Sequence, residues 1–443
     1  MIMISRSRSR LDEKLGMLYY STSSSPINGR IRTFTEDFIV EEILRDKTVV
    51  PVNVNSRISL PLCDVVKGNY VRAILIKKGY DTLSAIFYLS KKFKLPISAF
   101  SYLGLKDARA LSSQLISIKI DYPISYYGER ILLTNSKQSL LPVKAHELYG
   151  NKFTITIRSI SLKSEDAVRR VQRIFSELSS FGGVLAYFGY QRFGTLNPIT
   201  HKIGKAIVKR NIDLAVSYLI NSNIGEKDPI KTGLRPRKNE VLDYERIVRR
   251  FFTKKSNALK AIKKVPLPIR RLFIHAYQSY LFNRILSERI KLGLPINRAV
   301  IGDLVGLPIF GSVSPQYVFH VDKNNLDKVN SLIKRNLISV VLPVPGYAIK
   351  KLPIGLAKEP IQGVLDDEGI SFNDFLIDML PNLRSPGTYR PVIFQVENFK
   401  IMSLLRNESS LSIKIQFSLR RGFYATMFLR ELIKPFDPAL LGF

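Results

Sequence analysis

The strict alternation of residues from Leu411 to Leu419 limits the possible fold more than any other feature of this chain. Every second residue is apolar, and those between are serine, lysine or glutamine. A period of two predicts a strand with one buried face. Similar alternation predicts strands at 115–121 and 153–157. Apolar residues at three- and four-residue spacing predict helices at 82–94, 164–180 and 271–292.

These strands and helices follow one another without a regular strand–helix–strand rhythm. Such mixing favours an α+β fold with a largely antiparallel sheet. The chain has 443 residues, of which 45% are hydrophobic, so it is long enough for two or more buried cores. The sequence therefore predicts more than one domain.

Charge indicates the kind of partner. Lysine and arginine total 68 against 36 acidic residues, which gives a formal net charge of +32. An excess this large favours a polyanion, and nucleic acid above all. Between Arg246 and Arg271 ten basic residues occur with no acidic one, and Phe251 and Phe252 are interleaved among them. We expect this run to contact phosphates, through lysines that include Lys254, Lys255, Lys263 and Lys264.

Other classes of protein receive no support from the sequence. No apolar run approaches the roughly 18 residues of a membrane span. Cys63 is the single cysteine, which excludes an internal disulfide and a cysteine-rich zinc site and fits a reducing cytoplasm. No phosphate-binding or dinucleotide-binding glycine loop occurs. We expect a cytoplasmic protein without metal or cofactor, and we expect the serine–arginine run at 5–10 to be a mobile tail.

The segment 102–114 carries the strongest chemical signal. Asp107 lies between two cations, Lys106 and Arg109, which favour the ionised carboxylate and suit a nucleophile or general base. Gly104 would permit a tight turn before it. On composition alone, a solvated ion cluster on the surface is the favoured interpretation of the segment.

Five further segments, together with this one, resemble the motifs of the TruD family of tRNA pseudouridine synthases. Gly104-x-Lys106-Asp107-x-x-Ala110-x-x-x-Gln114 is similar to the family's G-x-K-D-x-x-A-x-T-x-Q, with Ser112 in the threonine position. The other matches occur in the family's order, at 35–42, 150–154, 187–194, 275–283 and 422–431. The resemblance covers nearly the whole chain, from about residue 12 to 434.

The resemblance implies that the chain isomerises uridine to pseudouridine in tRNA, at uridine 13 and, in archaeal-type relatives, also at uridine 35 of tRNA-Tyr. It implies that Asp107 is the catalytic nucleophile, in a catalytic set with Lys106, Arg32 and Phe188, whose ring would stack on the flipped base. We expect the substrate to be bound by Arg109, Gln114, Gln191 and Arg192, besides the lysines of the basic run. No cofactor is implied.

The resemblance also implies a split architecture. A pseudouridine-synthase core would comprise residues 1–212 and 390–443, and an inserted α/β TRUD domain would comprise 213–389. We expect a monomer.

Two alternatives remain. The chain could be an RNA-binding protein of the same fold with little catalysis, because it has Ala186 where the family commonly has asparagine and Arg420 where it commonly has proline. An asparagine at 186 could donate to the catalytic carboxylate or the uracil, so Ala186→Asn would then speed the reaction. A cofactor-dependent RNA methyltransferase would need a glycine-rich cofactor loop.

Overall fold

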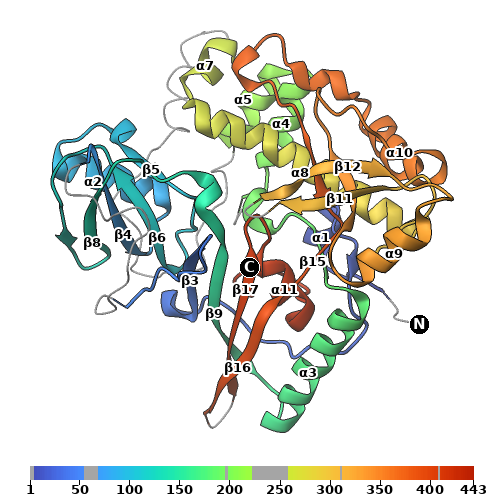
Figure 1. Cartoon of the computed structure of the whole chain (residues 1–443), viewed down its shortest axis with the longest axis horizontal. Helices are drawn as coiled ribbons and strands as arrows, with labels where there is room; N and C mark the ends of the chain where they lie inside the picture. Colours follow the sequence, from blue (N-terminus) through green and yellow to red (C-terminus); the bar gives the residue numbers. More distant parts are fainter. Residues whose placement is uncertain (1–3, 54–67, 195–197, 222–257, 310–311, 408–409) are drawn as a thin grey trace.

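Long strands with buried apolar faces join in this chain into one curved sheet, which the computed structural model shows in Figure 1. The structure describes residues 4–53, 68–194, 198–221, 258–309, 312–407 and 410–443. Within these residues the main sheet has nine strands, and all neighbours in it are antiparallel except β3 and β6. Its strands in spatial order are β16 (Glu397–Arg406), β17 (Leu411–Arg420), β9 (Leu148–Ile160), β3 (Phe38–Leu44), β6 (Leu111–Ile118), β4 (Tyr70–Lys78), β8 (Ile131–Ser139) and β7 (Tyr126–Tyr127), with β5 (Phe100–Tyr102) paired to β6.

Among the helices that cover parts of this sheet, two match the sequence prediction closely. The helix α2 (Thr82–Phe93) begins at the N-cap Asp81, whose side chain accepts from the Ser84 amide. It packs on β4 and β6 at the left of Figure 1. The helix α3 (Ser164–Phe181) ends at Gly182, which has a φ of 101°. The predicted α+β class with a largely antiparallel sheet is confirmed.

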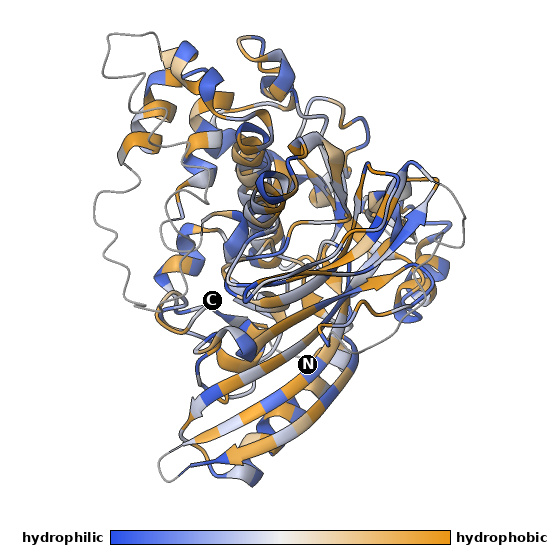
Figure 2. Ribbon diagram, turned by 90° about the vertical axis from the view of Figure 1, so that its left-hand side faces the viewer, coloured by the Kyte–Doolittle hydropathy of each residue, from blue (hydrophilic) through white to orange (hydrophobic). Residues whose placement is uncertain are grey.

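The strand predicted at 115–121 differs from the observed one. The strand β6 starts four residues earlier, at Leu111, and ends at Ile118. Both of its faces are buried, because α2 covers one side and a second small core that includes Leu44 and Leu148 covers the other. The strand β17 behaves as predicted, and the long strands at the bottom of Figure 2 show the alternation of hydrophilic and hydrophobic residues.

A second, four-stranded antiparallel sheet lies with six helices at the top and right of Figure 1. Its strands in order are β12 (Ser312–His320), β11 (Leu304–Ile309), β13 (Ser339–Val344) and β14 (Thr388–Pro391). The helices of this part are α4 (Thr200–Val208), α5 (Ile212–Asn221), α7 (Ala258–Lys264), α8 (Leu267–Lys291), α9 (Leu326–Lys334) and α10 (Glu359–Glu368).

The segment 388–394 joins the two parts of the molecule. Its first half, β14, pairs with β13 of the second sheet. Its second half, β15 (Ile393–Phe394), pairs with β10 (Val184–Leu185), which precedes residue 186 of the first part. The domain limits at 212/213 and 389/390 remain a prediction. The packing of α4 against α8 places residues 200–208 with the predicted insert.

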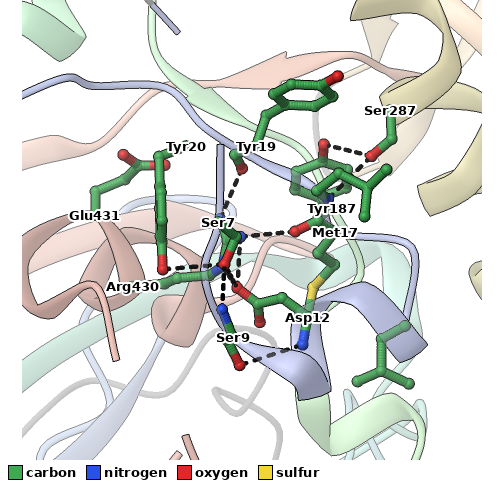
Figure 3. Close-up of polar contacts among 12 residues, drawn as sticks. Ser7, Ser9, Asp12, Met17, Tyr19, Tyr20, Tyr187, Ser287, Arg430 and Glu431 are labelled. Atoms are coloured by element: carbon green, nitrogen blue, oxygen red, sulfur yellow. Dashed lines mark hydrogen bonds and ion pairs between the residues drawn. The ribbon is translucent and has the colours of Figure 1, made fainter. Parts of the chain in front are cut away.

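The N-terminal residues are ordered, which makes the prediction of a mobile tail wrong for residues 4–10. Ser5–Arg6 forms β1, paired with β2 (Tyr19–Tyr20), and Ser9 caps α1 (Arg10–Lys14). Buried Asp12 forms an ion pair of 2.6 Å with Arg430 of α11 (Ala425–Ile433), as Figure 3 shows. Such a pair must be well hydrogen-bonded because both charges lose their water, and Ser7 donates to the same carboxylate.

Candidate active site

Asp107 lies on the loop between β5 and β6, at the wall of a cavity of about 540 Å³. The cavity is bounded by this loop, by β3 and β9, by the start of α8 and by residues 421–426. Its volume falls in the usual range for small-ligand pockets. The Asp107 side chain is 50% exposed, so its carboxylate is accessible to a ligand in the cavity.

Lys77, at the end of β4, fixes the backbone of this loop by hydrogen bonds. The Lys77 side chain is fully buried, and its Nζ donates to the carbonyls of Tyr80, Lys106 and Asp107 at 2.7, 3.3 and 3.1 Å. The hydroxyl of Thr82, the first residue of α2, accepts a hydrogen bond from the Lys106 amide at 2.8 Å. The two side chains fix the position of Asp107 relative to the sheet.

Gln114 belongs to this support and not to the cavity wall. It is fully buried, its amide oxygen accepts from the Thr82 hydroxyl at 2.9 Å, and its Nε2 donates to the Gly104 carbonyl at 3.4 Å. Gly104 has no positive φ, and a Cβ there would lie in ordinary contact, 3.5 Å from Lys106 Nζ. The expectation that Gly104 makes a turn closed to other residues is therefore wrong.

Lys106 lines the cavity but directs its charge into the protein. Its Nζ lies 2.6 Å from Oε1 of Glu42, and the second oxygen of Glu42 accepts from the Leu115 amide at 2.9 Å. Both side chains are buried. A buried pair of this kind fixes geometry because breaking it leaves an uncompensated charge.

Arg32 approaches Asp107 from the other side. Its Nη2 lies 3.4 Å from Oδ2 of Asp107, its Nη1 donates to the Gly442 carbonyl at 3.1 Å, and its guanidinium lies 4.1 Å from the ring centre of Phe38. Burial lowers the pKa of Arg32 to about 10; Asp107 opposes this shift and Arg109 adds to it. Arg32 has a φ of 56°, a conformation that non-glycine residues adopt where the surroundings impose it.

Of the other predicted ligands of the substrate, Gln191 and Arg192 line the same cavity, whereas Arg109 does not. Arg109 is partly buried, and its pKa is lowered by burial although Asp107 opposes the shift. Gln191 and Arg192, from a short 3-10 turn (Tyr190–Arg192), line the wall opposite Asp107's loop. The amide oxygen of Gln191 accepts from Thr426, whereas its Nε2 has no partner among the residues that the structure describes. A cavity wall with unpaired donors suits an oxygen-rich ligand.

Phe188 does not line this cavity but a neighbouring one of about 480 Å³. Tyr424, Arg192, Arg421 and Gly422 line both, so they form the partition between them. The Tyr424 ring lies close to the backbone of Gly189, where an added Cβ would come within 3.1 Å of that ring. A side chain at 189 would therefore displace Tyr424.

The two departures from the family pattern have structural accounts. Ala186 is fully buried and lines neither cavity, which gives no support to the expectation that an asparagine there would reach Asp107. Arg420 pairs with Glu397 on the adjacent strand at 2.9 Å and lies outside the lining of both cavities.

The basic run is described only in part, because Lys254 and Lys255 lie outside the described residues. Lys263 and Lys264 are exposed at the end of α7. Shortly after them, Ile269 and Leu272 of α8 line the Asp107 cavity. The two lysines are therefore close in sequence to its rim.

Sequence reasoning missed several residues of the site. Glu42 ends the matched 35–42 segment and Tyr424 lies in the matched 422–431 segment, so their motifs could have indicated them. Lys77 carries no local signal, since it is one basic residue in a strand of a basic chain.

Known proteins resemble this chain over nearly its whole length. The model of the family "tRNA pseudouridine synthase D (TruD)" matches residues 14–432. Two similar archaeal proteins, each called "Probable tRNA pseudouridine synthase D", come from Pyrobaculum islandicum and Thermococcus sibiricus. They are 32% and 33% identical over 98% and 94% of this chain, and over 98% and 97% of their own length. The crystal structure of a TruD protein from Methanosarcina mazei superposes with a TM-score of 0.71, at 29% identity over 97% of this chain and 98% of that one.

Proposed function

The chain belongs to the TruD family of tRNA pseudouridine synthases, and we propose that Asp107 is the nucleophile with which it isomerises uridine in tRNA. The observation that carries this assignment is the half-exposed Asp107 carboxylate in a cavity, on a loop held by Lys77, Lys106 and Thr82. A rigid loop holds a nucleophile in a fixed orientation relative to its substrate. Such orientation contributes much of the rate enhancement in enzyme reactions.

The reaction breaks the N1–C1′ bond, turns the uracil and joins C5 to C1′, so substrate and product have the same atoms and the same oxidation state. The Asp107 carboxylate would form the transient bond to the substrate, and Arg32 would orient one of its oxygens. Lys106 with Glu42 and Lys77 would position the loop. We assign Gln114 to the same support, in place of a contact with substrate.

The target base must leave its stack, at a cost of a few kcal/mol. Stacking on an aromatic ring recovers about 1–3 kcal/mol per base. Tyr424 lines the Asp107 cavity, and Phe188 lies behind it with ring centres 6.1 Å apart. We therefore propose that the uracil contacts Tyr424 and that Phe188 supports this ring.

The finer assignments remain proposals that rest on the family. They concern the targets, which we propose to be uridine 13 and uridine 35 of tRNA-Tyr, the oligomeric state, which we propose to be a monomer, and the location, which we propose to be the cytoplasm. Among the described helices, none combines the length and the apolar character of a membrane span.

The proposed reaction is tested by incubating the protein with unmodified tRNA transcripts and mapping pseudouridine by carbodiimide adducts and primer extension. We expect one new stop that depends on the protein. Transcripts that bind but gain no stop would contradict the assignment and favour a binding protein.

Arg32→Gln should slow single-turnover conversion by about 10- to 100-fold. The change removes a hydrogen bond to a charged carboxylate, which contributes roughly 1.5–3 kcal/mol, and each 1.36 kcal/mol of barrier is about tenfold in rate. Arg30→Gln is the matched control, because it removes the same charge from an exposed position two residues earlier. Equal rates for both variants would argue against a role of Arg32 at the carboxylate.

Binding of tRNA should weaken steeply with salt, because a net charge of +32 implies many phosphate contacts. Replacing exposed Lys263 and Lys264 with alanine should make the log–log slope of affinity against salt shallower by about 0.7–0.9 for each phosphate that the variant no longer neutralises. The weakening should be similar for all tRNAs. Weakening confined to one tRNA, in filter-binding titrations at several salt concentrations, would instead indicate base recognition.

A further inference from the structure

The second cavity lies where the two parts of the molecule meet, and its wall is cationic. One side is formed by Phe188, Arg192 and Tyr424, and the other by α8 and the segment 385–390. Three arginines and one histidine line it, and no aspartate or glutamate does so among the residues that the structure describes. Burial, and then Arg192 and Arg271, lower the pKa of His275 in this wall to about 4. The surroundings therefore disfavour any further positive charge.

Arg390 is the buried member of this wall. Its side chain is almost inaccessible, with 4% of the residue exposed. Its Nε donates to the Ala186 carbonyl at 2.8 Å and its Nη1 to the Gly422 carbonyl at 3.1 Å, whereas its Nη2 is buried and has no partner in the described part of the chain. The guanidinium lies 4.1 Å from the ring centre of Phe188. Two of its three nitrogens are thus fixed by backbone carbonyls, and the third is left for another acceptor.

We propose that this cavity binds a backbone phosphate of the tRNA, next to the nucleotide whose base enters the Asp107 cavity, with Arg390 Nη2 and Arg192 as donors. The proposal deepens the proposed function and rests on it for the identity of the ligand. The shared partition of Arg192, Arg421, Gly422 and Tyr424 makes the two cavities direct neighbours. A nucleotide with its base on one side of Tyr424 can therefore place a flanking phosphate on the other.

A phosphate fits this wall better than a base does. A uracil edge offers both donors and acceptors, whereas the charged groups that line this cavity are all cations or cation-forming. An arginine held in a fixed plane suits the oxygens of a phosphate in particular. If Arg390 were only a structural cation packed on Phe188, replacing it would not change how much any single phosphate contributes to the affinity for tRNA.

The test is phosphate ethylation interference on end-labelled tRNA, which reports on every phosphate of the tRNA and does not depend on turnover. The reference protein is the inactive variant Asp107→Asn. It is compared with a double variant that carries Arg390→Met in addition to Asp107→Asn. We expect ethylation of one or two adjacent phosphates to weaken binding of the reference protein by about tenfold, as for the removal of a hydrogen bond to a charged group. The Arg390→Met protein should be insensitive at those positions, and they should flank the uridine that the wild type converts.

Two further variants make the outcome decisive. Arg192→Met, from the opposite wall, should lose sensitivity at the same phosphates, and it decides the matter if Arg390→Met does not fold. Arg169→Met is the control, because it removes an arginine whose side chain is 73% exposed on α3. Identical interference patterns in all proteins would overturn the phosphate site even if pseudouridine forms. An Arg390-dependent pattern without any pseudouridine would keep the site and overturn the proposed reaction.

Discussion

Asp107→Asn should reduce pseudouridine formation to background, a decrease on the order of 10⁴-fold or more, as for other enzymes that lose their nucleophile. The amide has nearly the same shape and still fits 3.4 Å from Arg32, but it cannot form the transient bond. Affinity for tRNA should stay within a few-fold, because binding is distributed over many phosphates. Single-turnover assays with the variant in excess over tRNA, alongside filter binding, measure both quantities.

The control for this variant is Asp166→Asn, which makes the same chemical change on α3, where Asp166 pairs with Arg169 on the surface. It should retain the wild-type rate. Normal turnover by Asp107→Asn would refute the assignment of the nucleophile, and a proportional decrease in tRNA affinity would show that Asp107 serves binding instead.

Sequence patterns predicted those helices whose limits depend on nearby residues alone. The helices α2 and α3 start at 82 and 164, as their apolar spacing and end signals indicate. The family motifs likewise led to Asp107 and Arg32, which the fold brings to 3.4 Å from one another across 75 positions of sequence. Residue spacing along the sequence could not predict that contact. It depends on how the sheet places the segment before β3, which carries Arg32, next to the loop before β6, which carries Asp107.

Some of the failures have one physical cause, which is burial of polar groups by distant segments. The serine–arginine run at 5–10 reads as a solvated tail until Arg430, more than 400 positions away, pairs with Asp12. Lys77 and Arg72, for which the sequence offered no prediction, are both fully buried in β4. Arg72 pairs with Glu147, and Lys77 binds three carbonyls. Only tertiary contacts reveal such partners.

Lys77→Met should slow the chemical step by about 10²-fold while the protein remains folded. Three carbonyls, of Tyr80, Lys106 and Asp107, lose their common donor, so the loop that carries Asp107 can shift. A displacement of about 1 Å at a reacting group can cost roughly 10²-fold in rate. The neighbouring Lys78→Met is the matched control, because Lys78 is partly exposed and pairs with Glu36 away from the loop. Single-turnover rates of the two variants test the prediction, and their melting temperatures show whether both remain folded.

The protonation of Lys77 makes this prediction dependent on pH. Burial lowers the pKa of Lys77 to about 7; Asp107 opposes the shift and Lys106 adds to it. The unfolded lysine titrates near 10.4. Between pH 7 and about 10.4 the unfolded state therefore binds more protons, and Lys77 makes the folded state more stable as pH rises.

Activity should change in the opposite direction over the same pH range. Above pH 7 the neutral amine has only two N–H donors for three carbonyls, so one carbonyl of the loop loses its bond and the loop loosens. We expect the wild-type single-turnover rate to fall between pH 7 and 9 although the protein does not unfold. Lys77→Met, already without that donor, should lack this decline. A decline of equal size in both proteins would assign the titration to another group, and a flat wild-type profile would show that the charge on Lys77 does not control the loop.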